Sequence, residues 1–483
     1  MPLPTIPSGN VASAISGAYE VANSCRFDGS SAYLSRTLST PTNASKFTYS
    51  CWVKRSDLTT GIFLFANGGD IQNFANIAFN AEYFFWHILD SNSEVSKLRT
   101  TAKYRDVSAW YNLVFVWDST QSTATDRTKM YVNGTRITSF GQQTNSGQNV
   151  NYDMNTAVEH MIGAEKGNTG GSVGNYFNGY MAEVAFVDGQ ALDPTSFGEY
   201  DEDSPQIWKP KDISSGITWG NNGFYLDFED SSALGNDVSG NNIDFSTSGL
   251  AATDQTTDTP TNNFATLNPL NVPTSNAPTF KEGNLETESA TTSGQRFMGS
   301  STIGVTAGKW YAECKIVVID SATVGVSPDV AVHAKDSTYI GSHAHDWSIL
   351  PDSGNKYADN NGTTHGDAFS TNDILMIALD LVNNNVYFGR NGNWFDGSGN
   401  ADEAAPNSAL SLTAPASTPE QAYFFACSDG GGSAKAKVQW NFGNPPFSIS
   451  SGNADANGYG AFEYAPPSGY LALCTKNLGS DGG

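Results

Sequence analysis

Apolar residues occur in short runs along most of the chain, separated by clusters of Gly, Asn, Asp, Ser and Thr. The runs are rich in Val, Ile, Phe, Tyr and Trp, and helical periodicity is nearly absent. Short β-branched and aromatic runs bounded by turn residues are typical of antiparallel strands. The pattern therefore predicts an all-β protein made of two antiparallel β-sandwiches.

The two strand-rich blocks share one local pattern. In the first block, the apolar run 111–118 is followed by a polar loop and an aromatic run over 129–134. In the second block, the run 373–380 is followed in the same way by 386–392. Both returning runs end in Asn-Gly, which is the strongest short-range signal for a β-hairpin. We therefore expect the same kind of sheet in both blocks.

Changes in composition divide the chain into four parts. We predict an N-terminal arm over 1–22, a first sandwich over 23–211, a connector over 212–295 and a second sandwich over 296–483. The later part of the connector is rich in Thr, Asn, Ser, Ala and Pro, and its apolar residues are isolated. Such a composition favours an extended segment that lies on its neighbours.

Charge excludes several classes of partner. The 483 residues contain 25 Lys and Arg against 49 Asp and Glu, which gives a net charge of −24. A chain this negative is repelled by phosphate backbones and anionic lipids, so we expect no nucleic-acid binding. We also expect no membrane insertion, because the strongest apolar run, 374–382, is about half as long as a spanning helix and contains Asp380. The N-terminus shows no signal-peptide pattern.

The five cysteines lie far apart in the sequence, and none has a Cys or His neighbour at zinc-site spacing. We interpret them as buried thiols of a protein made in a reducing compartment.

Several segments of the first block occur in the order expected for a known fold; they are residues 27–35, 47–54, 110–114, 130–134 and 177–192. On these segments the block resembles a concanavalin-like, laminin-G-type jelly roll. The second block resembles a SPRY domain on four segments, which are 308–314, 373–392, 441–447 and 464–473. Between the blocks, 224–228 and 237–245 resemble the opening strands of another laminin-G-type domain, which we expect to dock on the second sandwich.

Tandem sandwiches behind a short arm resemble the virion proteins of tailed phages, particularly marine ones. The resemblance implies a virion protein, a tail fibre or surface-attached fibre component, assembled in the cytoplasm of the bacterial host. It implies a homo-oligomer whose arm binds other virion proteins and whose lectin-like sandwiches bind a host surface glycan or receptor. One alternative is a capsid decoration or tail-associated protein with structural contacts only.

A polysaccharide-degrading enzyme is the other alternative, because glucanases share this sandwich. Their pattern Glu-x-Asp-x-x-Glu places alternate carboxylates in one cleft. The nearest segment, 199–204, has Ser204 at the position of the last acid. Glu183 lies on a predicted strand, at a place in the family pattern that is commonly structural. We therefore expect no enzymatic activity.

Sugar binding by such sandwiches uses aromatic rings together with short amides or carboxylates. Loop aromatics and their polar neighbours are the best candidates, and we select Tyr176, Asn178, Tyr339, Trp347 and Trp394. Asn175 lies beside the first of these. In the strand 83–90, only Trp86 or His87 could be presented to solvent, and Trp86 fits the core better.

Calcium is the one cofactor that the sandwich class suggests, because its loops supply carboxylate and carbonyl oxygens. The candidate ligands are Asp230, Asp237, Asn241 and Asp244, with a second acidic cluster at 201–203. Asx turns are the alternative explanation for these residues.

Histidines are concentrated in the second block, where four of the six occur; they are His333, His343, His345 and His365. His343 and His345 precede Asp346, and Asp367 or His365 could supply a further ligand to a metal ion. The alternative is that they are exposed polar residues of a loop.

Overall fold

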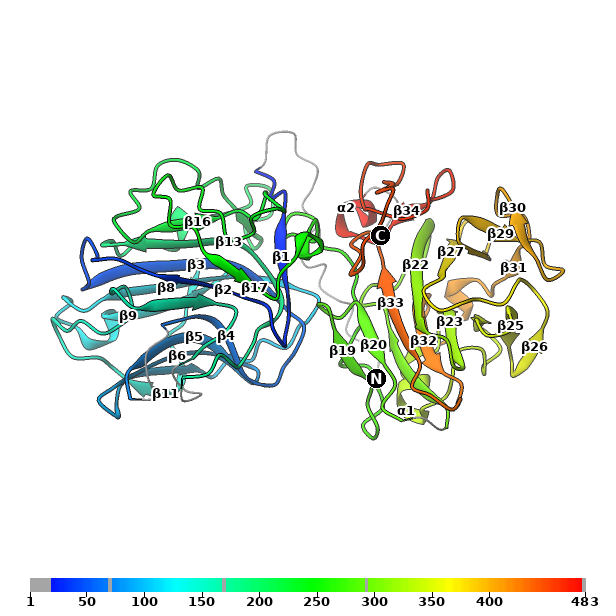
Figure 1. Cartoon of the computed structure of the whole chain (residues 1–483), viewed down its shortest axis with the longest axis horizontal. Coiled ribbons are helices and arrows are strands. Elements are labelled where there is room, and N and C mark those ends of the chain that lie inside the picture. Colours follow the sequence, from blue (N-terminus) through cyan, green and yellow to red (C-terminus); the bar gives the residue numbers. More distant parts are fainter. Residues whose placement is uncertain (1–18, 68–71, 167–170, 292–293, 480–483) are drawn as a thin grey trace. The chain divides into compact units, whose positions relative to one another are not determined.

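The computed structural model describes residues 19–67, 72–166, 171–291 and 294–479, which form two compact units with a boundary between Thr261 and Asn262 (Figure 1). Both units consist of sheets that are antiparallel apart from one short parallel pairing in the second unit, which confirms the predicted fold class. Among the described residues, no helix is long and apolar enough to cross a membrane.

Two eight-stranded sheets form the first unit. Sheet A has the order β10 (Thr135–Arg136), β9 (Thr128–Val132), β8 (Trp110–Asp118), β3 (Lys46–Arg55), β13 (Asn178–Asp188), β1 (Ser24–Asp28) and β18 (Gln255–Thr256), with β16 (Phe224–Leu226) also on β13. Sheet B has the order β11 (Phe140–Thr144), β7 (Ser93–Thr100), β6 (Tyr83–Asp90), β5 (Phe74–Asn80), β4 (Thr60–Asn67), β12 (Glu159–Ile162), β2 (Tyr33–Thr37) and β17 (Ser246–Ser248). A separate pair is formed by β14 (Gly198–Tyr200) and β15 (Trp208–Pro210).

The core of the first unit lies between these sheets and is built by the period-two alternation of their strands. The outer face of sheet A is covered as well. Val114 and Val116 of β8 pack there against Ile213 and Trp219, which lie beyond β15.

The segment 212–261 belongs to the first unit, which corrects the predicted connector. β16, β17 and β18 pair with β13, β2 and β1 of the first sandwich, and they do not dock on the second as expected. The physical reason is burial, because Phe224, Leu226 and Phe245 fill the core between sheets A and B. The second unit begins at Asn262, whereas the predicted second sandwich began at residue 296.

A buried ion pair also holds this segment. Lys54 Nζ of β3 lies 2.7 Å from Asp258 Oδ2, and both side chains are almost fully buried. Trp110 Nε1 donates to the other carboxylate oxygen at 3.1 Å. Burial lowers the pKa of Lys54 and the Asp258 charge opposes this shift. The contact joins two residues 204 positions apart in the sequence.

The second unit contains a ten-stranded and a six-stranded sheet. The larger has the order β19 (Thr279–Lys281), β20 (Glu286–Glu288), β33 (Lys437–Asn441), β22 (Lys309–Val318), β27 (Ile374–Asp380), β28 (Asn385–Arg390), β29 (Asn393–Phe395) and β30 (Ala401–Glu403), with β31 (Leu410–Ser411) on β28 and β34 (Leu471–Ala472) parallel to β22. The smaller has the order β21 (Arg296–Ser300), β32 (Phe424–Asp429), β23 (Ala322–Ser327), β24 (Trp347–Leu350), β25 (Asn355–Ala358) and β26 (Asn361–Thr363).

Helical segments are short. The α-helices are α1 (Val330–Asp336) and α2 (Thr475–Leu478), and the 3-10 helices are η1 (Ala124–Asp126), η2 (Pro194–Ser196), η3 (Ala252–Asp254) and η4 (Pro415–Ser417).

Both predicted hairpins are confirmed, because β8 pairs with β9 and β27 pairs with β28. Each returning strand ends in Asn-Gly with positive φ at both residues, 48° and 73° at 133–134 and 50° and 92° at 391–392. This is the backbone of a type I′ turn, which glycine adopts without strain. All five cysteines are buried and unpaired, as predicted.

Most of the predicted N-terminal arm, residues 1–18, lies outside the described residues. Tyr19, in the last part of the arm, contacts the first unit, where its hydroxyl donates to Glu183 at 3.0 Å. Glu183 lies in a β-bulge of β13 and also accepts from the Tyr225 hydroxyl at 2.7 Å. Burial raises the pKa of Glu183 to about 7.

We expect Glu183 to make the stability of the first unit depend on pH. Between pH 4.5 and about 7 the folded chain keeps a proton that the unfolded chain has lost, so stability falls as pH rises through this window. The side chain in Glu183→Gln cannot ionise. The variant should therefore lose up to about 3 kcal/mol less of its free energy of unfolding than wild type over this pH window. Denaturant unfolding at pH 5 and pH 8 measures the difference, and an equal fall in wild type and variant would contradict the assignment.

Breaking the Lys54–Asp258 pair should strongly destabilise the first unit. Lys54→Met leaves the Asp258 carboxylate buried without its cation, which costs about 3–5 kcal/mol. The double variant Lys54→Met, Asp258→Asn should recover part of this loss, since no uncompensated charge remains. Lys209→Ala is the control, because Lys209 pairs only at the surface, 3.5–3.6 Å from Asp201 and Glu199, and should cost under about 1 kcal/mol. Similar losses of stability in Lys54→Met and Lys209→Ala would contradict a special contribution of the buried pair.

Candidate ligand-binding site

A groove of about 350 Å³ lies on the outer face of sheet B, over β4, β5 and β6. Aromatic rings, amides and one imidazole line it; the lining residues are Gly61, Phe63, Phe74, Asn76, Ala78, Phe79, Asn80, Phe85, His87 and Asn175. Its volume falls within the range of small-molecule sites.

The hollow results from side-chain size across neighbouring strands. Phe63 of β4, Ala78 of β5 and Phe85 of β6 lie opposite one another in the strand register. The small side chain of Ala78 leaves a depression between two phenyl rings. Phe63, Ala78 and Phe85 pack together as a small apolar cluster apart from the main core.

A polar pair lies beside this aromatic row. Asn76 of β5 is opposite His87 of β6. Asn76 is 2% exposed, and its Oδ1 atom has no hydrogen-bond partner among the described residues. His87 Nε2 is also buried and makes no hydrogen bond within that part of the chain, although Glu94 Oε2 lies 3.5 Å away. A buried polar atom without a partner costs about 1–3 kcal/mol, so two in one groove indicate a place for a polar ligand or water.

The surroundings of His87 favour a neutral ring. Burial lowers the pKa of His87, and the nearby Lys97 lowers it further. Glu94 acts in the opposite direction, but its Oε2 lies 3.5 Å from His87 Nε2 and is held at 2.7 Å by Lys97. The rings of Phe74 and Phe85 lie 5.3 and 5.6 Å from the imidazole. A neutral imidazole can donate or accept a hydrogen bond at its free nitrogen.

Asn175 closes one side of the groove from the loop before β13. Its Nδ2 donates to the buried Glu165 at 2.7 Å, which fixes the orientation of the amide. Gly61 allows this approach, because a Cβ there would lie 3.3 Å from Asn175 Oδ1 and φ at Gly61 is +78°.

The two ligand candidates that the sequence suggested in the first unit do not line this groove. Tyr176 is half-buried, packs on Tyr33 at 6.2 Å and donates to the Val173 carbonyl. Asn178 begins β13, opposite Asp28 in the strand register. Their neighbour Asn175 is the residue that reaches the groove.

The second-unit candidates lie at separate places. Tyr339 donates to Asn360 at 2.8 Å, and Trp347 donates to the Ser411 carbonyl at 2.9 Å. Trp394 lines a hollow of about 570 Å³ together with residues such as Lys309 and Tyr470.

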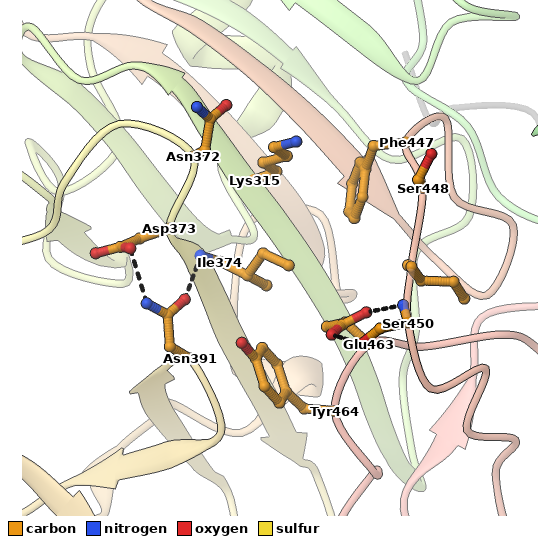
Figure 2. Close-up of a pocket in the computed structure, with 11 residues that line it drawn as sticks. Lys315, Asn372, Asp373, Ile374, Asn391, Phe447, Ser448, Ser450, Glu463 and Tyr464 are labelled. Carbon is orange, nitrogen blue, oxygen red and sulfur yellow. Dashed lines mark hydrogen bonds between the residues drawn. The ribbon is translucent and has the colours of Figure 1, made fainter.

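A further hollow of about 500 Å³ in the second unit is shown in Figure 2. Its polar groups bond to one another: Glu463 accepts from Ser450, and Asn391 bridges Asp373 and the Ile374 amide (Figure 2). These groups do not need a ligand in the way that Asn76 and His87 do. The groove of the first unit is therefore the stronger candidate site.

The side chains of the four calcium candidates form hydrogen bonds within the protein, and Asp230 and Asp237 accept from the amide two residues further on, as in Asx turns. The Asp237 carboxylate accepts four hydrogen bonds, from the amides of Tyr225, Ser239 and Ile243 and from the Ser239 hydroxyl. The remaining three behave alike: Asp230 accepts from Ser232, Asn241 donates to the Gly220 and Gly223 carbonyls, and Asp244 accepts from the Asp237 amide.

The structure brings only part of the predicted histidine set together. His343 and Asp346 come together with His333, a histidine of the same stretch. His345 is turned toward Thr413 Oγ1 at 3.1 Å, and His365 packs edge-on against Phe395.

Sequence reasoning missed Asn76, Ala78 and Phe85. The signal that could have found the first two is the alternation in β5, where Ala75, Ile77 and Phe79 enter the core and the intervening residues face outward. The register that places them beside β6 is not visible in the sequence. Of the two residues considered on β6, Trp86 is in the core and His87 lines the groove.

Residues 28–196, which include the whole groove, match the family model of the Concanavalin A-like lectin/glucanases superfamily. The first unit contains a concanavalin-like domain. No curated protein matches the chain.

Among solved structures, a heptameric SAP-like pentraxin from Limulus polyphemus is 18% identical, with a TM-score of 0.28 over 36% of this chain and 80% of its own. The SPRY domain of human HERC1 is 19% identical, with a TM-score of 0.27 over 36% of this chain and 96% of its own. A protein of Bacteroides ovatus described as carbohydrate-binding is 19% identical, with a TM-score of 0.33 over 49% of this chain and 65% of its own.

The environment of His87 leads to a testable titration. We expect its imidazole to protonate below the ordinary value near 6.5, because burial and Lys97 disfavour the charged ring. Two-dimensional NMR of the histidine side chains across pH 4–8 measures this, and His87→Ala identifies the resonance by its loss. A midpoint at or above 6.5 would show that the ring is open to solvent or paired with Glu94.

Proposed function

We propose that the first unit binds a saccharide in the groove of sheet B. The observation that carries the proposal is a pair of buried atoms, Asn76 Oδ1 and His87 Nε2, that make no hydrogen bond within the described residues and lie in one groove with the rings of Phe63 and Phe85. Pyranose rings present apolar C–H faces and hydroxyl groups together. Aromatic rings accommodate the first, and amide and imidazole groups hydrogen-bond the second.

The charge of the protein favours a neutral saccharide. With a net charge of −24, the chain repels polyanions at long range. The groove itself offers the neutral donors and acceptors of Asn76, Asn80, His87 and Asn175. These groups match hydroxyls better than they match carboxylate or sulfate groups.

Binding without hydrolysis is part of the proposal. Glycoside hydrolysis needs two carboxyl groups on either side of the scissile bond. The described residues that line the groove include no Asp or Glu. Glu94, which lies 3.5 Å from His87 Nε2, is paired with Lys97 at 2.7 Å.

The wider role follows from the resemblance to phage virion proteins. In this proposal the chain is a fibre-like virion protein, its N-terminal segment attaches it to other virion proteins, and the groove engages host surface glycans. Several copies on one particle would make weak single-site binding sufficient through avidity. Isolated protein should then adhere to host cells, whereas a decoration protein would bind only particles.

The groove is tested by binding of the full chain to a glycan array, followed by calorimetry with the retained sugar. His87→Ala and Asn76→Ala should each weaken binding about 3- to 10-fold, the worth of one hydrogen bond. Ala78→Leu fills the depression between the two phenyl rings and should weaken it further.

Tyr176→Phe is the matched control, because Tyr176 is adjacent to Asn175 and does not line the groove. It should bind as wild type. Equal binding by all variants, or loss only in Tyr176→Phe, would place the site elsewhere. Release of reducing sugar from the bound glycan would overturn the proposal that the groove binds without hydrolysis.

A further inference from the structure

A second cluster of unusual chemistry lies in the second unit, around the helix α1. His333 is on the helix, Asp329 directly precedes it, and His343 and Asp346 lie in the loop before β24. Ligand atoms of His333, His343 and Asp346 all lie within 4.8 Å of one another. Glu420 approaches from the loop before β32, where its Oε1 accepts from the Ala331 amide at 2.7 Å.

Two carboxylate oxygens in this cluster make no hydrogen bond to the described part of the chain. Asp329 is 5% exposed, and its Oδ1 is buried and unpaired among the described residues. It occupies the N-cap position of α1, yet its side chain makes no capping bond. Glu420 Oε2 is also buried and unpaired in this part of the structure. Burial raises the pKa of Glu420, and the charge of Asp329 contributes to the shift.

Compensating charge is scarce at this place. Within the described residues, no Lys or Arg forms an ion pair with Asp329, Asp346 or Glu420; their charged-group contacts are His333 with Asp346 and His343 with Asp329. Buried carboxylates are normally paired or coordinate a metal ion. A divalent cation would balance the excess negative charge.

The local distances also suit a metal ion. His333 Nε2 lies 3.1 and 3.2 Å from the two oxygens of Asp346. Two ligands at about 2.1 Å from one ion are separated by roughly 3.0–3.5 Å at tetrahedral or octahedral angles. The other ring nitrogen, Nδ1, lies 2.7 Å from Thr338 Oγ1. A hydrogen bond from Nδ1–H to that oxygen would leave Nε2 unprotonated, as metal-bound histidines require.

We infer that His333, His343 and Asp346 form a binding site for a divalent transition metal ion, with the carboxylates of Asp329 and Glu420 beside them adding negative charge. Two imidazoles with carboxylates suit Zn²⁺ or Mn²⁺, whereas Ca²⁺ prefers oxygen ligands alone. The His343 ring stacks on that of His333 at 4.3 Å with planes 15° apart. Nearly parallel rings cannot both point at one ion, so His343, which is 28% exposed, turns its ring when the ion binds.

Zn²⁺ is the probe for the test. The full chain is treated with EDTA, and Zn²⁺ binding is measured by calorimetry and by metal analysis after dialysis. We expect one ion per chain with a raised unfolding temperature of the second unit. Histidine NMR should show shifts at His333 and His343 and none at His345.

Two variants and one control keep the test decisive. His343→Ala removes a partly exposed ligand, and Asp329→Asn is isosteric, so both should fold, which circular dichroism checks. Each should weaken Zn²⁺ binding at least 10-fold. His345→Ala is the control, because His345 is turned to Thr413, and should bind as wild type. Unchanged binding in His343→Ala and Asp329→Asn, or no Zn²⁺ binding by wild type, would show that His333 simply donates its Nε2–H to Asp346 and would overturn the site.

Discussion

The alternation of side chains along β4, β5 and β6 is the constraint on which the candidate site depends. Each strand buries one face between the two sheets of the first unit. The position next to a core residue must then point outward. Asn76 lies between Ala75 and Ile77, and His87 lies between Trp86 and Ile88, so both face the groove because their neighbours fill the core. A shift of one residue in register would exchange groove and core.

The outer face of sheet A is covered by later segments of the chain, whereas the candidate groove lies on the outer face of sheet B. Trp219 and Ile213 pack on the outer face of sheet A. The ion pair of Lys54 with Asp258 lies outside the main core and ties a late segment to β3. Since these contacts occupy sheet A, the outer face of sheet B carries the depression over Ala78.

The groove and the histidine cluster violate the same physical rule, although they lie in different units. Buried polar groups in folded proteins almost always have hydrogen-bond partners. Asn76 and His87 in one place, and Asp329 and Glu420 in the other, leave buried atoms unpaired within the described residues. The surrounding groups differ, with phenyl rings in the first case and imidazoles with carboxylates in the second. That difference points to a neutral polar ligand for one and a cation for the other.

Local patterns in the sequence determined the all-β class, the two hairpins β8–β9 and β27–β28, the Asn-Gly turns that follow them and the burial of the five cysteines, because these depend on residues close together in the chain. The place of 212–261 was not predictable in this way, since β17 and β18 pair with strands more than two hundred residues away in the sequence. Tyr176 was selected as a loop aromatic, yet the adjacent Asn175 reaches the groove. His333 lies close to His343 only because α1 packs against the loop that follows it. Sequence determines which faces a strand offers, whereas tertiary structure decides which faces meet, because strand register and loop packing arise from contacts between distant residues.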